Sequence, residues 1–99
     1  MVIGMIKLNI NIPWAHSLKE KRKEVKSICD KVKNRYNASI AEVDKHDIHQ
    51  EIGLGIAWVS NSFSHSDSIG EKVLNFIEDN TEGDIIDVQK EIVSVGEKY

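Results

Sequence analysis

The sequence is poor in cysteine and proline, with one residue of each in 99. A lone Cys29 cannot form an internal disulfide, which fits a reducing, cytoplasmic setting, and it reads as a small core residue on a helix. No apolar run approaches the roughly 20 residues of a membrane span. Lys7 and Asn9 also interrupt the apolar stretch that a signal peptide needs. We therefore expect a single domain over residues 1–99, with no membrane partner.

Two spacings of the apolar residues predict the secondary structure: every second residue for strands, and every third or fourth residue for helices. From Val2 to Ile12 every second residue is apolar or glycine, which is typical of a half-buried strand, and Pro13 ends it because proline cannot donate to the ladder. Ser17 and Glu20 form a capping-box pattern that starts a helix, and apolar residues at helical spacing continue it to Tyr36. The same reasoning predicts the remaining elements: a strand over 38–46, a strand over 51–60, a helix from 64 or 66 to 80, and a strand over 85–95.

The buried faces of these strands are only partly determined. In the second strand Ile40 and Glu42 share one parity while Ala41 and Val43 share the other, so the pattern leaves its buried face open. The pattern leaves the buried face of the third strand open as well: its large residues either face the helices or point outward, in which case Trp58 would be an interface anchor. The large set is Ile52, Leu54, Ile56 and Trp58, and the opposite set is Gly53, Gly55, Ala57 and Val59. A change of apolar parity in the last strand indicates a bulge or an edge.

The element order β-α-β-β-α-β predicts the α+β, ferredoxin-like split β-α-β fold. It implies one antiparallel four-stranded sheet of order 4-1-3-2, with both helices on one face. Strand direction then brings the start of the first helix and the connection between strands two and three to the same end of the sheet. Residues 17–22 and 44–50 should therefore share one rim.

Positive charge is concentrated in the first helix. Residues 17–36 hold eight Lys/Arg and three Asp/Glu, whereas the other residues hold five Lys/Arg and thirteen Asp/Glu, and the whole chain has a net charge of -3. The sequence thus places one cationic helix on an acidic body, and this asymmetry bears on partners rather than on fold.

Several short motifs resemble a known family. They are Ile12-Pro13, Ser17-Leu18-Lys19-Glu20-Lys21-Arg22, Asn34-Arg35-Tyr36-Asn37, Ala41-Glu42-Val43-Asp44, Asp47, Leu54-Gly55 and Val59-Ser60-Asn61. In these residues the chain resembles the YlxP-like family of small bacterial proteins, also called domain of unknown function 503. The resemblance implies a ferredoxin-like fold and says little about chemistry, because the family has no established activity. Genes of this family often lie among translation and ribosome-maturation genes, which implies an RNA or ribosome connection by association only.

The leading functional hypothesis is a non-enzymatic, cytoplasmic protein that binds RNA or a ribosomal particle through the first helix. A helix N-terminus and nearby cations suit phosphate, and such contacts give affinity without base reading. A solvated lysine-rich face is the plain alternative. The candidate phosphate contacts are Lys19, Lys21, Arg22, Lys23, Lys26, Lys33 and Arg35.

A second hypothesis uses the other face of the sheet. RNA-recognition sheets carry stacking aromatics on their central strands, and this face carries none if the large residues of the third strand face the helices. Its small, partly apolar residues favour a protein-interaction adaptor that forms a homodimer through the sheet or an edge strand, although an open solvated face would look the same.

A third hypothesis concerns metal. Glu42, Asp44 and Asp47 are oxygen ligands close together in sequence, and they would be needed by a metal-dependent phosphoesterase. The spacing matches no established metal motif, and aspartates that cap their own turn explain it equally well. No nucleophile-base pair or phosphate-loop motif accompanies them, so we expect neither a cofactor nor catalysis.

Overall fold

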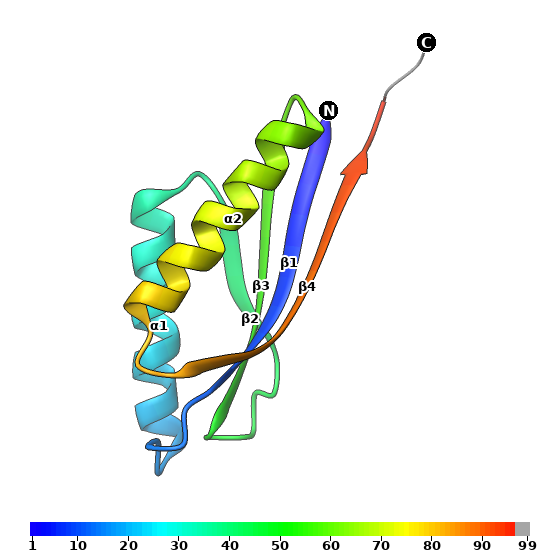
Figure 1. The fold of residues 1–99 in the computed structure, drawn as a ribbon. Helices are drawn as coiled ribbons and strands as arrows, with labels where there is room; N and C mark the ends of the chain where they lie inside the picture. The colour runs from blue at the N-terminus through cyan, green and yellow to red at the C-terminus, as the bar shows by residue number, and fades with distance from the viewer. Residues whose placement is uncertain (97–99) are drawn as a thin grey trace.

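The alternating N-terminal strand lies in the middle of the molecule, as Figure 1 shows for a computed structural model that describes residues 1–96. The elements are β1 (Val2–Asn11), α1 (Leu18–Arg35), β2 (Ser39–Asp44), β3 (Glu51–Ser60), α2 (Phe63–Asn80) and β4 (Asp84–Ser94). The sheet has the order β2-β3-β1-β4, and each neighbouring pair is antiparallel. Both helices cover the same face of this sheet (Figure 1). The predicted ferredoxin-like α+β fold is confirmed.

The core lies between the helices and the inward face of β1 and β3. Cross-strand pairs such as Ile6 with Ile56 and Leu8 with Leu54 form its floor. The two helices cover it with the buried residues Ile28, Val32, Val73 and Ile77. Each such aliphatic side chain contributes about 1.5–3 kcal/mol when it leaves water. Cys29 is also buried, as predicted, and the desolvation raises its thiol pKa.

Trp58 decides the orientation of β3. Its ring is 2% exposed, and its indole N–H donates to the hydroxyl oxygen of Ser66 at 2.8 Å. The ring occupies space that side chains would otherwise take at Gly4 and Gly70, where an added Cβ would lie 2.2 Å and 3.1 Å from it. The large side chains of β3 therefore face the helices, which decides between the two alternatives that the sequence left open, and Trp58 is not an outward anchor.

Serine hydroxyls start both helices. Ser17 accepts a hydrogen bond from Glu20 N at 3.2 Å, and Ser62 accepts one from His65 N at the same distance. Each cap is worth about 1 kcal/mol. The reciprocal contact from the Glu20 carboxylate to the Ser17 amide is not formed, so only half of the predicted capping box is present. Helix α2 begins slightly earlier than its apolar stripe indicated, because Ser62 provides the cap.

Two bulges interrupt the sheet, one in β4 and one in β2. The register between β1 and β4 shifts next to Ile10, where Asp87 and Ile85 oppose successive β1 residues and Ile86 is left over. The bulge lies earlier in the strand than the parity change that predicted one. The second bulge lies between Glu42 and Asp44. β2 then ends at Asp44, short of the predicted strand, because Lys45 takes a left-handed backbone conformation with φ of 63°.

Candidate nucleic-acid interface

The outer surface of α1 carries a stripe of exposed cations. Helical geometry places five of them within about 100° of arc. We call this set, which is exposed throughout, the basic stripe: Lys19, Arg22, Lys23, Lys26 and Lys33. It faces away from the sheet because the opposite side of α1 holds the apolar core residues. Lys31 and Arg35 are also exposed but lie outside the stripe, Lys31 beyond one edge of it and Arg35 nearly on the opposite side of the helix.

Acidic partners neutralise little of the basic stripe. Lys26 lies 2.7 Å from the Asp30 carboxylate one turn later, and this contact raises the pKa of the lysine. Among residues 1–96, the other four members of the stripe form no ion pair. Exposed pairs of this kind contribute little to stability. The charge of the stripe is therefore largely unused by the fold.

Lys21 is the exception among the predicted phosphate contacts, and the prediction is corrected for it. Its side chain is 1% exposed. The ammonium group lies 2.9 Å from Glu42 Oε2, and it donates to the carbonyl of Ile48 at 2.8 Å and to that of Lys45. A buried lysine with three oxygen partners cannot reach a phosphate. The sequence contains the signal, because Lys21 fills the gap in the apolar stripe between Leu18 and Val25.

Glu24 is a second buried charge on α1, and sequence reasoning missed it. The carboxylate accepts hydrogen bonds from Thr81 Oγ1 at 2.7 Å and from Glu82 N at 3.0 Å. It thereby ties α1 to the connection between α2 and β4. With Glu24 buried, the surface of α1 shows seven exposed cations against one exposed acid, Asp30, and the half-buried Glu20.

Arg35 is partly engaged at the end of α1. Its guanidinium carbon lies 5.7 Å from the centre of the Phe76 ring, which meets Tyr36 edge-on at 5.6 Å. A shallow hollow of about 560 Å³ borders these side chains. This cation-π contact keeps Arg35 with α2 rather than with the basic stripe.

The predicted shared rim is confirmed. The ammonium group of Lys21 joins α1 to the backbone carbonyls of residues 45 and 48, in the loop between β2 and β3. Gln50, in the same loop, forms hydrogen bonds with the segment that connects β1 to α1. Its backbone carbonyl accepts from Ile12 N at 2.9 Å, and its side-chain amide donates to Pro13 O at 3.3 Å. Figure 1 shows the β1–α1 connection and the β2–β3 connection at the lower end of the molecule.

The candidate metal ligands are not brought together, which corrects that prediction. The bulge in β2 turns Glu42 toward the helices and Asp44 toward the open face. Lys21 binds Glu42, and Lys7 lies 3.1 Å from Asp44. Asp47 is exposed in the loop beyond. Within residues 1–96 no group of three or more His, Cys, Asp or Glu side chains is placed to hold a metal ion.

A four-stranded antiparallel sheet covered on one face by two helices defines a small ferredoxin-like domain, here with one cationic helix. The chain belongs to the family described as "Protein of unknown function (DUF503)", whose model matches residues 3–90. It is 39% identical over 77 residues to the uncharacterised protein YlxP of Bacillus subtilis (strain 168). The matched residues cover 78% of this chain and 84% of that protein. The family resemblance seen in the sequence is therefore confirmed.

Two solved structures share the fold. Protein YJCS has a TM-score of 0.59 at 15% identity, with 93% of this chain and 99% of that chain covered. A de novo designed protein with a ferredoxin fold, solved by NMR, has a TM-score of 0.57 at 18% identity, with coverage of 100% and 92%. These identities support a common fold and nothing more.

In the part of the chain that the structure describes, no helix has the length and apolar character to span a membrane.

Proposed function

We propose that this protein binds the phosphate backbone of RNA, free or within a ribosomal particle, through the basic stripe of α1. The observation that carries the proposal is the set of exposed cations on one face of one helix of an otherwise acidic protein, of which only Lys26 is paired with an acid. Cations that the fold does not use remain available to a ligand. The acidic remainder repels a polyanion from other surfaces, so it would orient the RNA on this helix.

The shape of the stripe favours backbone contact with little sequence preference. From Lys19 to Lys33 the helix rises about 21 Å, so several phosphates could be engaged at once. Base readout needs exposed aromatic or hydrogen-bonding groups that reach base edges. Within the described residues the open sheet face carries no aromatic ring, and Trp58 is buried beneath the helices. Binding is expected to be driven by counterion release and to weaken steeply with salt.

Charge neutralisation tests the proposal. We would replace four stripe residues with glutamine, a good helix former, as Lys19→Gln, Arg22→Gln, Lys23→Gln and Lys33→Gln. Lys26 is left in place because it pairs with Asp30, and Lys21 because it is buried. Fluorescence anisotropy with a labelled single-stranded RNA and with a labelled hairpin, over a series of NaCl concentrations, would report affinity and salt slope.

The expected result is a loss of affinity together with a shallower salt dependence. For single-stranded RNA the slope of log K against log salt is negative, and its magnitude should decrease by about 3 when four phosphate contacts are lost. Arg22→Gln and Lys72→Gln form a matched pair, because each removes one exposed cation, the second from α2. Only Arg22→Gln should weaken binding. The proposal fails if the wild type binds neither RNA at low salt, or if the fourfold variant binds with unchanged affinity and slope.

A further inference from the structure

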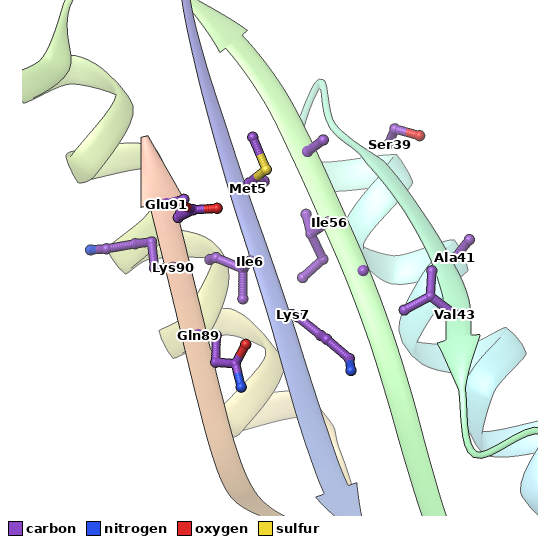
Figure 2. A pocket seen from close by; sticks show the side chains of 12 residues that line it. Met5, Ile6, Lys7, Ser39, Ala41, Val43, Ile56, Gln89, Lys90 and Glu91 are labelled. Carbon is purple, nitrogen blue, oxygen red and sulfur yellow. The ribbon is translucent and has the colours of Figure 1, made fainter. Parts of the chain in front are cut away.

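The face of the sheet opposite the helices is open and hollowed. The hollow has a volume of about 470 Å³, and Figure 2 shows that side chains of all four strands surround it. Its surroundings are partly apolar. Val59 on β3 is 65% exposed, and it stands in register with the half-buried Ile3, which in turn pairs with Val93 of β4.

The strand register places small side chains on one half of this face and long side chains on the other half. Two neighbouring rows cross the sheet from β2 to β4, namely Ser39-Ala57-Met5-Glu91 and Ala41-Gly55-Lys7-Gln89. In both rows the two residues from β2 and β3 are small and the two from β1 and β4 are long. Gly55 must lack a side chain, because a Cβ there would lie 2.9 Å from Val43 Cγ1, a residue that the β2 bulge displaces toward this face. In these two rows the half formed by β2 and β3 is therefore lower than the half formed by β1 and β4, except where the Val43 side chain lies over Gly55.

We propose that this open face is the interface of a homodimer whose two-fold axis runs along the strands, between the two sheets. Such an axis reverses the strand order in the second copy. The long side chains of β1 and β4 in each copy then lie over the small residues of β2 and β3 in the other. Two-fold symmetry fills both low halves at once, which is the self-complementarity that an isologous interface requires. A two-fold axis across the strands would instead set long side chains against long ones and leave the low halves empty.

The area agrees with a second copy as the occupant, and the positive charge at the centre of the face is already paired. Strands of these lengths, spaced about 4.8 Å apart, present a face of about 600 Å², so a dimer would bury about 1,200 Å². That value lies at the lower end of specific interfaces and well above most lattice contacts. Lys7, the central cation of the face, is already paired with Asp44, so the interface buries no lone positive charge. The basic stripe stays exposed on both outer sides, and the dimer is independent of the proposed RNA binding.

Analytical ultracentrifugation of the full chain over a concentration series tests the dimer. Ala57→Arg and Ala41→Arg each put a long charged side chain into the low half, and in a monomer both would extend into solvent. Ser68→Arg adds the same group to an exposed position on α2 and serves as the matched control. We expect dimers for the wild type and for Ser68→Arg, and monomers for the two alanine variants. Circular dichroism would verify that all four proteins are folded.

Cross-linking tests the direction of the axis. The proposed axis places Ala41 of one copy over Gln89 of the other, about 10 Å away across the interface. Within one copy the same two residues are three strand spacings apart, which is about 14 Å. A thiol cross-linker with a span of about 10 Å should join an equal mixture of Ala41→Cys and Gln89→Cys proteins. Neither variant should cross-link alone. The proposal is overturned if the wild type remains a monomer at every concentration, if Ala57→Arg and Ala41→Arg still form dimers, or if Ala41→Cys cross-links to itself.

The fourfold glutamine variant of the basic stripe separates this outcome from that of RNA binding. It should form dimers like the wild type whether or not it binds RNA, because none of its changes lies on the open face. Failure of one proposal therefore leaves the other standing.

Discussion

The ammonium group of Lys21 lies 2.8 Å from the carbonyl oxygen of Ile48, although the two residues belong to different layers of the molecule. The same group binds the carboxylate of Glu42 at 2.9 Å and the carbonyl of Lys45. One buried lysine thus fastens the first turns of α1 to the end of β2 and to the loop that follows. This contact explains why the rim is a single unit, and it gives Lys21 a structural role that its basic neighbours lack.

Replacing Lys21 by methionine should destabilise the fold. Methionine keeps the length of the side chain but leaves Glu42 as a largely buried carboxylate without a partner and two carbonyls without a donor. We expect Lys21→Met to lower the free energy of unfolding by about 3 kcal/mol, measured by urea denaturation. Lys23→Met, on the exposed basic stripe, is the matched control and should change stability by less than about 0.5 kcal/mol.

A second substitution identifies the origin of that loss. In Lys21→Met/Glu42→Leu the unpaired carboxylate is gone, so the double variant should regain part of the stability lost by Lys21→Met alone. A double variant less stable than the single one would show that the cost lies in the loop carbonyls rather than in the charge. A single variant as stable as the wild type would contradict the structural role assigned to Lys21.

Gly4 should tolerate no side chain while Trp58 is present. An added Cβ would lie 2.2 Å from Cε2 of the indole, which is far inside van der Waals contact. Alanine in a strand is normally more stable than glycine, but here overpacking should reverse the sign and cost about 1–3 kcal/mol. Thermal or urea unfolding of Gly4→Ala measures this effect. In a Trp58→Leu background the same change should become neutral or stabilising, and equal costs in both backgrounds would refute the explanation.

The fold was predictable because each element has a strong local signal. Alternation in β1, the serine cap of α1 and the two-sided pattern of β3 all point to the observed arrangement, and element order then supplies the topology. The candidate site was harder to predict, because a lysine count does not distinguish exposed from buried. Lys21 and Glu24 are recognisable only from where they fall on the helix relative to its apolar stripe.

The bulge in β2 could not be inferred from sequence alone. A regular strand would have sent Glu42 and Asp44 to the same face and kept a metal site conceivable. The extra residue at Val43 separates the two carboxylates, and Gly53 and Gly55 provide the space for it, since a Cβ at either glycine would approach Asp44 or Val43 within 3 Å. Such a displacement depends on contacts between strands that no local pattern reports.

Cys29 should react slowly in the folded protein. Burial raises the pKa of its thiol, so less of the reactive thiolate is present, and access is also restricted. Alkylation by iodoacetamide should be slower in native protein than in urea, and the native rate should keep rising above pH about 8.5, where a free cysteine is already half ionised. Because the unfolded thiol ionises first, the fold loses stability from this group as pH rises above that value. Equal rates and equal pH profiles in both states would contradict this account.

Asp44 provides a test at the acidic end of the pH scale. Hydrogen bonds from the Lys7 ammonium at 3.1 Å and from the Lys45 amide at 2.9 Å lower the pKa of its carboxyl group. The stabilising contribution of this contact is therefore present above the ordinary aspartate pKa of about 3.9 and is lost as pH falls through the lower, folded value.

An NMR titration of the Asp44 carboxyl carbon measures that pKa directly. In Lys7→Met it should rise toward the ordinary value but not reach it, because the Lys45 amide still donates to the carboxylate. Lys72→Met, which removes a cation from α2, is the control and should leave the Asp44 titration unchanged. If Lys7→Met also leaves it unchanged, the amide alone lowers the pKa, and the ion pair across the open face contributes nothing in solution.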